Sequence, residues 1–156
     1  MIYFIATVVI LFVDQIVKNR VALYILQGDR IELIRGFIRL THVQNYGAAF
    51  SMMQNMRWIL LGVTGAFMIG LVVVIFKGDI ITSPLEKWCA AFIAGGATGN
   101  AIDRILTGYV IDMFEFEFVN FAIFNVADCF IVLGGTLFII LTVLSFIKER
   151  KLKIGD

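Results

Sequence analysis

Long uncharged stretches alternate with short charged ones along this chain. Residues 1–13 carry no charge, and the helical pattern continues from there to about Leu26. Residues 58–76 and 129–147 are each 19 uncharged residues long, enough as an α-helix to cross an apolar layer of roughly 30 Å. The pattern therefore predicts membrane-spanning helices over these three stretches.

A fourth hydrophobic stretch, residues 88–102, is shorter at 15 residues and is rich in glycine and alanine. Ala91, Gly95 and Gly99 recur at every fourth position, so they share one helix face. Small residues on one face let neighbouring helices approach closely inside a membrane. We expect this stretch to be the central one of four transmembrane helices.

The segments between the predicted helices differ in character. Residues 114–118 alternate between phenylalanine and glutamate, which predicts a half-buried strand within 110–118. Residues 29–43 alternate less regularly and indicate a small β-sheet at the membrane surface, whereas residues 77–87 predict a plain turn. The predicted fold class is an all-α integral membrane protein with a β-sheet cradle between helices 1 and 2 and a short strand segment between helices 3 and 4.

Composition agrees with this fold. Hydrophobic residues make up 60% of the 156-residue chain and charged residues 16%, against about 45–50% and about 25% in soluble domains. One domain, residues 1–156, cannot bury that much apolar surface, so the excess faces lipid. The net charge of +1 lacks the basic field of nucleic-acid-binding proteins, so we expect no nucleic-acid partner.

Charge counting leaves the orientation in the membrane open. Four spans place both termini on one side, and that side has six basic residues against seven on the other. This difference is too small for the positive-inside rule to decide. The basic residues that cluster in 148–153 favour cytoplasmic termini.

Acidic residues recur on the side opposite the termini, at span edges or in a connection. A charge near the bilayer centre costs at least about 2.5–3.5 kcal/mol on insertion scales, so each of these acidic residues is expected to have a structural or functional role. The fold can gather these residues at a single depth. They are Asp14, Asp103, Asp112 and Asp128.

Some of these residues have a purely structural interpretation. Asp14 and Lys18 are four positions apart with the acid first, which favours an ion pair on one helix face. Asn125 and Asp128 lie at the start of the last helix, where both residue types are favoured as N-terminal caps.

A second polar group lies at the end of the third helix, where three residues share one face. This group is either a helix-end hydrogen-bond cluster or part of a site, and the spacing leaves both open. Its members are Asn100, Asp103 and Arg104.

Asp112 interrupts an apolar stretch and has no basic residue within six positions, so tertiary partners or a proton must neutralise it. The 15 residues between Asp112 and Asp128 allow the chain to reverse and bring the two together. Two adjacent carboxylates push their pKa values apart, leaving one ionised and one protonated. Such a pair supplies the general base and general acid of an aspartic protease, which needs no metal.

Other chemistries have less support. His42 is the only histidine, so a His-rich zinc site or a Ser-His-Asp triad would depend on it, and we expect a surface or strand residue instead. Ser51 lacks a nucleophile-elbow motif. Cys89 and Cys129 lie in apolar runs and predict buried free thiols. We expect no metal and no other cofactor, and a small transporter or an assembly factor remains as an alternative.

Five segments together carry a family resemblance. They are residues 14–18 (DQIVK), 43–50 (VQNYGAAF), 95–104 (GGATGNAIDR), 110–114 (VIDMF) and 124–128 (FNVAD). In this order, and spanning nearly the whole chain, they make the sequence resemble the bacterial lipoprotein signal peptidases, also called signal peptidase II. The resemblance implies a four-helix aspartic endopeptidase that cleaves prolipoproteins just before the diacylglyceryl-modified cysteine.

The resemblance also implies roles for individual residues. Asp112 and Asp128 fall on the family's catalytic pair. Met113 departs from the aromatic residue usual at its position, which affects only local packing. Eight further positions match motif residues that bind substrate or support the pair: Asp14, Lys18, Asn45, Gly47, Asn100, Asp103, Arg104 and Asn125.

Location and partners follow from the same resemblance. It implies a multi-pass protein of the bacterial cytoplasmic membrane with cytoplasmic termini and an active site near the outer face. The expected partners are diacylglyceryl-modified prolipoproteins and membrane lipids, and we expect a monomer.

Overall fold

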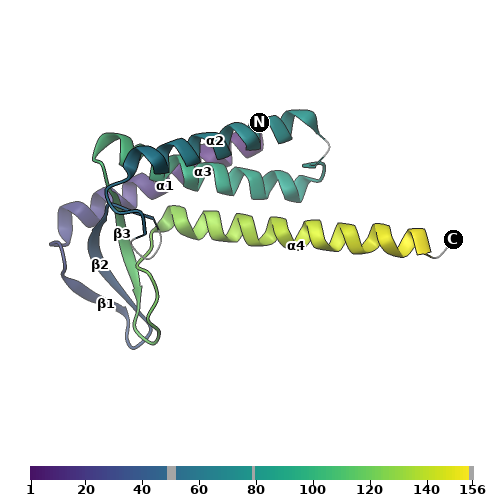
Figure 1. The fold of residues 1–156 in the computed structure, drawn as a ribbon. Coiled ribbons are helices and arrows are strands. Elements are labelled where there is room, and N and C mark those ends of the chain that lie inside the picture. The colour runs from purple at the N-terminus through teal and green to yellow at the C-terminus, as the bar shows by residue number, and fades with distance from the viewer. Residues whose placement is uncertain (49–51, 79, 155–156) are drawn as a thin grey trace.

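Four long helices and one small sheet make up the part of the chain that the computed structural model describes, which is residues 1–48, 52–78 and 80–154 (Figure 1). The helices are α1 (Ile2–Tyr24), α2 (Arg57–Lys77), α3 (Pro84–Leu106) and α4 (Val126–Ile154). The strands are β1 (Arg30–Ile34), β2 (Ile38–Asn45) and β3 (Val110–Phe116). Each helix therefore contains one of the four hydrophobic stretches of the sequence.

Helix α3 is the central helix, since it packs against α1, α2 and α4. A Cβ atom on Gly95 would lie 2.8 Å from Ile10 Cγ2 on α1. A Cβ atom on Gly96 would collide with the Ala127 carbonyl oxygen of α4. The small residues of α3 thus permit the close helix approach that the sequence predicted.

Three of the described helices are long and apolar enough to cross a membrane: α1, α2 and the Val126–Lys148 part of α4. Helix α2 has no buried residue, and bulky side chains such as Phe67 and Ile69 point outward from the protein. An apolar surface of this kind is what a lipid-facing helix requires. Helix α3, which carries Asn100, Asp103 and Arg104, does not belong to this group of three.

The two strand-forming segments join in one antiparallel sheet with the order β1-β2-β3. Both segments were predicted as strands, but not their pairing: Arg39 of β2 lies opposite Glu115 of β3, and Asn45 lies opposite Val110. The sheet lies at the end of the helices opposite the two termini (Figure 1). It thereby holds β3 across the beginning of α4, where the polar residues converge.

The prediction of a plain turn over residues 77–87 was wrong at its end, because α3 begins at Pro84. Ser83 Oγ accepts a hydrogen bond from the Glu86 backbone N–H at 3.2 Å, and Glu86 Oε2 accepts one from the Ser83 N–H at 2.8 Å. This capping box, with proline in the first turn, starts the helix four residues before the hydrophobic stretch. Asp79, in the same segment, lies outside the described residues.

Two further expectations need correction or refinement. Cys89 is buried as predicted, but Cys129 is exposed because it lines an open cavity between α3, α4 and β3. His42 is a strand residue of β2 as predicted, and it is buried at 7% exposure, with Nδ1 2.9 Å from the Ile25 carbonyl oxygen. Ser51 lies outside the described residues.

Candidate active site

A cavity of about 590 Å³ lies between α3, α4, β3 and the segment that connects β3 to α4. Asp112 and Asp128 both line it, although they are 16 positions apart in the sequence. Its walls are mostly apolar and include Phe121, Val132 and Leu133. The cavity therefore combines two carboxylates with an extended hydrophobic surface.

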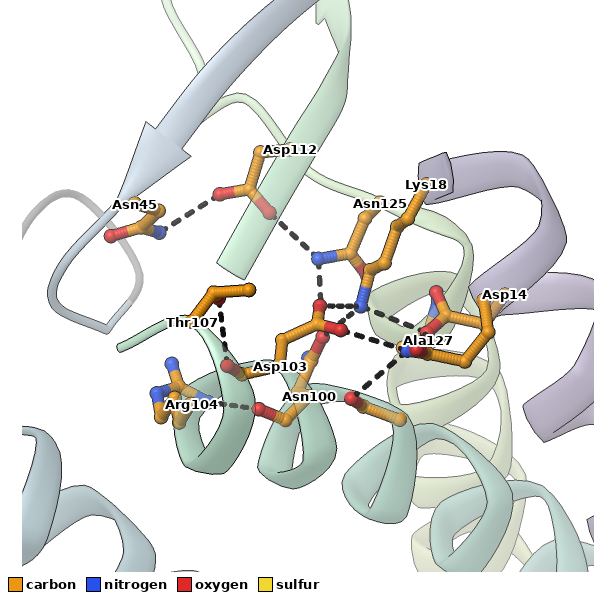
Figure 2. Close-up of polar contacts among 12 residues, drawn as sticks. Asp14, Lys18, Asn45, Asn100, Asp103, Arg104, Thr107, Asp112, Asn125 and Ala127 are labelled. Atoms are coloured by element: carbon orange, nitrogen blue, oxygen red, sulfur yellow. Dashed lines mark hydrogen bonds and ion pairs between the residues drawn. The ribbon is translucent and has the colours of Figure 1, made fainter. Parts of the chain in front are cut away.

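Asp112 is 3% exposed on β3 and is held by two asparagine amides. Its Oδ2 accepts a hydrogen bond from Asn45 Nδ2 at 2.8 Å, and its Oδ1 accepts one from Asn125 Nδ2 at 2.6 Å (Figure 2). Burial, together with the nearby charge of Asp128, raises the pKa of Asp112 to about 6 despite the two donors. The carboxyl group can therefore hold a proton under mildly acidic conditions.

Asp128 lies in the first turn of α4 and takes part in its N-terminal cap. The Asn125 N–H donates to Asp128 Oδ2 at 3.1 Å, and the Asp128 N–H donates to Asn125 Oδ1 at 3.0 Å. Asn100 Nδ2 donates to Asp128 Oδ1 at 2.8 Å. The predicted cap is confirmed, and it fixes the carboxylate at the cavity wall.

Behind the cavity is a buried ion cluster of Asp14, Lys18 and Asp103 (Figure 2). Lys18 Nζ lies 2.8 Å from Asp14 Oδ2 and 2.7 Å from Asp103 Oδ2, and it donates to Asn100 Oδ1 at 2.8 Å. Asp14 Oδ1 accepts a hydrogen bond from the Ala127 N–H of α4 at 2.9 Å. The predicted Asp14–Lys18 pair is confirmed, and it ties α1 to α3 and α4.

Arg104 links α3 to the end of β2. Its Nη2 donates to the Gly47 carbonyl oxygen at 2.8 Å, and the Gly47 N–H donates to Asn45 Oδ1 at 2.9 Å. A Cβ on Gly47 would collide with the Met52 carbonyl oxygen, so a larger residue does not fit. Ala49 and Phe50, which complete the sequence motif, lie outside the described residues.

The structure thus brings together all ten residues singled out in the sequence. It also adds Gln15, which belongs to the segment 14–18 but for which no role was predicted. Gln15 Nε2 donates to Asp103 Oδ1 at 2.8 Å and to the Gly99 carbonyl oxygen at 3.3 Å. The sequence did contain a signal for such a role, because a polar amide that directly follows an acidic residue in an apolar segment needs a hydrogen-bond partner. Among the described residues, no three His, Cys, Asp or Glu side chains are grouped to hold a metal ion.

Comparison with known proteins identifies the family of this chain. A family model described as signal peptidase (SPase) II matches residues 6–144. The chain belongs to the signal peptidase II family. The resemblance predicted from the five segments is therefore confirmed, and with it the class of a bacterial membrane protease.

Relatives in this signal peptidase II family align over most of the chain. The lipoprotein signal peptidase of Brevibacillus brevis is 35% identical over 148 residues, which cover 95% of this chain and 99% of that protein. The one from Streptococcus pneumoniae is 36% identical and covers 94% of each.

Two solved structures share the fold. Both are described as bacterial membrane enzymes obtained by the in meso method, one at 2.3 Å and one at 1.9 Å resolution. The first has a TM-score of 0.87 at 29% identity and covers 95% of this chain and 90% of that one. The second has a TM-score of 0.82 at 30% identity and covers 90% of this chain and 91% of that one.

Proposed function

We propose that this chain is a membrane aspartic endopeptidase that removes the signal peptide of prolipoproteins by cutting before the diacylglyceryl-modified cysteine. The observation that carries the proposal is that Asp112 and Asp128 line the same cavity. The two carboxylates are joined through amides, since Asn125 donates to Asp112 and to Asn100, and Asn100 donates to Asp128.

The pair performs general acid–base chemistry on a water molecule and a peptide carbonyl. The ionised carboxylate takes a proton from water while the protonated one donates its proton to the carbonyl oxygen, which gives a tetrahedral intermediate. The newly protonated carboxyl group then gives its proton to the leaving nitrogen while the other carboxylate takes a proton from a hydroxyl of the intermediate, and the C–N bond breaks. The raised pKa of Asp112 supports this assignment, because one proton must be shared at working pH. Neither carboxylate is assigned as the first base, because the proton of two interacting carboxyl groups belongs to the pair.

The surroundings of the pair suit a lipidated substrate. The cavity continues along α4 past Val132, Leu133 and Thr136, which offers apolar surface to acyl chains or to a signal segment. Arg104 and Asn45 line the same cavity and can hold backbone carbonyls in place for attack. The name lipoprotein signal peptidase, which the relatives carry, fits this combination.

We propose that α3 also crosses the membrane, as the fourth span between the three apolar helices. The termini then lie in the cytoplasm, and the sheet and cavity lie near the outer face of the bacterial cytoplasmic membrane. Support comes from Figure 1, in which both termini lie at the end of the helices opposite the sheet. We expect the protein to work as a monomer without a cofactor.

Cleavage of a diacylated precursor by the purified protein tests the proposal. In lipid bicelles, we expect the wild type to release the signal peptide, and Asp112→Asn and Asp128→Asn to fold but leave the precursor uncut. Asp29→Asn is the matched control, because Asp29 is exposed outside the cavity, and it should cleave normally. Full cleavage by either cavity variant, or proton flux through liposomes without cleavage, would overturn the proposal.

An unlipidated precursor of the same sequence tests the substrate class separately. If the apolar cavity holds the lipidated cysteine, removal of the diacylglyceryl group should abolish cleavage. Equal rates for both precursors would leave the acid–base chemistry standing and refute the lipid requirement.

A further inference from the structure

Three asparagine side chains donate hydrogen bonds to the carboxylates of Asp112 and Asp128, from Asn45 and Asn125 to the first and from Asn100 to the second. An asparagine amide can turn either its NH₂ or its oxygen toward a neighbour. Only the NH₂ stabilises an ionised carboxylate. The arrangement therefore depends on what holds each amide oxygen away from the pair.

For two of the three asparagines, a backbone N–H holds the oxygen. The Gly47 N–H donates to Asn45 Oδ1 at 2.9 Å, and the Asp128 N–H donates to Asn125 Oδ1 at 3.0 Å. A backbone N–H is only a donor, so each of these amides has one favourable orientation.

Asn100 differs, because its strongest oxygen partner is a side chain. Lys18 Nζ donates to Asn100 Oδ1 at 2.8 Å, whereas the other donor, Asn125 Nδ2, lies at 3.3 Å. An ammonium has three N–H donors and no acceptor, and Asp14, Asp103 and Asn100 occupy all three. Lys18 is 2% exposed, so water does not replace these partners.

We propose that Lys18 is a positioning residue for the proposed peptidase reaction, which fixes the Asn100 amide so that its NH₂ faces Asp128. It thereby does for Asn100 what a backbone N–H does for Asn45 and Asn125. The effect crosses to Asp112 as well, since Asn125 donates to both Asn100 and Asp112. This inference rests on the proposed function and goes beyond charge balance with Asp14 and Asp103.

Two variants separate positioning from folding. Lys18→Met removes the donor but leaves two buried carboxylates without their cation, so it also loses stability. The double variant Lys18→Met/Asp14→Asn keeps the net charge of the cluster at −1, as in the wild type with one cation and two anions. The amide oxygen that Asp14→Asn introduces can still accept from the Ala127 N–H that Asp14 binds. Arg20→Met is the control, because Arg20 is an exposed cation on the same helix.

The readouts are kcat and KM for a diacylated precursor over a range of pH, normalised to folded protein. For the double variant, we expect kcat to fall about tenfold or more, as loss of a hydrogen bond to a charged group predicts, with KM within about twofold. The acidic limb of the pH profile should move to higher pH, because a carboxylate without its donor is harder to ionise. An unchanged kcat and pH profile in the double variant would reduce Lys18 to a structural role and overturn the inference.

A measurement without substrate keeps this test independent of the proposed function. Infrared titration of the carboxyl groups should show ionisation of the cavity pair at higher pH in the double variant than in the wild type and Arg20→Met. Coincident titrations would overturn the inference even if the wild type cleaves. A shifted titration would support it even if the precursor is not the substrate.

Discussion

Two groups of charged side chains in this protein have similar composition and opposite surroundings. The buried ion cluster of Asp14, Lys18 and Asp103 has side chains that are 0–10% exposed. The second group is a charged ladder on the sheet, formed by Arg30, Arg39, Glu115 and Glu117, whose side chains are 15–57% exposed. The distances are similar, from 2.7 to 2.8 Å in the cluster and from 2.9 to 3.4 Å in the ladder.

The difference between them lies in what each charge would do without its partner. Arg30, the exposed member of the ladder, returns to water when it loses its partner, and exposed pairs contribute about 0–1 kcal/mol. A cluster residue that loses its partner stays buried, which costs about 3–5 kcal/mol. The cluster is also connected to Asp128 through Asn100, whereas the ladder pairs with no cavity residue in the part of the chain that the structure describes. Burial, more than distance, decides which ion pairs matter for fold and site.

The largest effect should come from breaking the cluster at Asp14. Asp14→Ala leaves Lys18 with one carboxylate fewer and the Ala127 N–H without its acceptor, so we expect a loss of about 3–5 kcal/mol in the free energy of unfolding. Thermal and denaturant unfolding in bicelles measures it. Asp14→Asn, which can still accept from Ala127, should lose clearly less. If both variants lost less than about 1 kcal/mol, the buried cluster would contribute no more to the free energy of unfolding than an exposed ion pair, which would contradict the prediction.

A glycine next to the cluster offers a second way to disturb it. A Cβ on Gly99 would lie 2.5 Å from Asp14 Oδ2, so Gly99→Ala must displace that carboxylate. We expect it to destabilise the protein by about 1–3 kcal/mol, the usual cost of overpacking. Gly70→Ala on α2 is the matched control, because a Cβ there would have nothing within 4 Å and alanine favours helix. Equal melting temperatures for the two variants would contradict the close packing.

Asp112 is intermediate, since it is buried like the cluster but is paired only with neutral amides. Its pKa of about 6 in the folded protein lies above the ordinary value of 3.8. The folded state therefore binds this proton more tightly, and the associated stability is present below about pH 4 and lost as the pH rises through 6. At about 1.4 kcal/mol per pH unit, the loss above pH 7 is about 3 kcal/mol.

Asp112→Asn removes this pH-dependent loss of stability, but the NH₂ of the new side chain then faces the NH₂ of one of its two asparagine partners. We therefore expect a net gain of about 1–2 kcal/mol in the free energy of unfolding at about pH 8. The gain should shrink as the pH falls towards about 5. Unfolding curves of wild type and variant across this pH range measure it, and a gain that grows at low pH would have the wrong sign.

The smallest effect should come from the ladder. Arg30→Gln removes a two-pronged contact with Glu115 that water largely screens. We expect a loss of less than about 1 kcal/mol, and less still in high salt. Unfolding at low and high ionic strength checks this. A loss as large as that of Asp14→Ala would remove the distinction between the two groups.

Much of this architecture could be predicted from the sequence, because charge-free stretches of membrane length have few alternatives. The start of α3 was missed because Pro84 was interpreted as part of a turn, although serine three positions before Glu86 is a capping-box pattern. The pairing of β2 with β3 could not be predicted, since it depends on how α3 carries the chain back across the molecule.

Some residues of the candidate site could be predicted from their residue type, and others, such as Asn45 and Gly47, only from the family resemblance, whereas the contacts among them could not be predicted. Single residues such as Asp112 were conspicuous because a charge in an apolar segment is costly. Their hydrogen bonds depend on tertiary packing: Lys18 reaches Asn100 because Gly99 lets α1 approach α3 closely. Spacing along one helix cannot reveal a contact between two.

The strand order β1-β2-β3 also determines when this protein becomes complete during synthesis. Strand β3 joins a hairpin that is synthesised before α2 and α3, and the cap of α4 follows β3. Asn45 is therefore synthesised before α2 and α3, and its partner Asp112 after them. A nascent chain stalled before residue 125 has neither Asn125 nor Asp128. The proposed catalytic pair is therefore complete only once the first turn of α4 has been synthesised, and a product that ends before residue 128 lacks one of its two carboxylates.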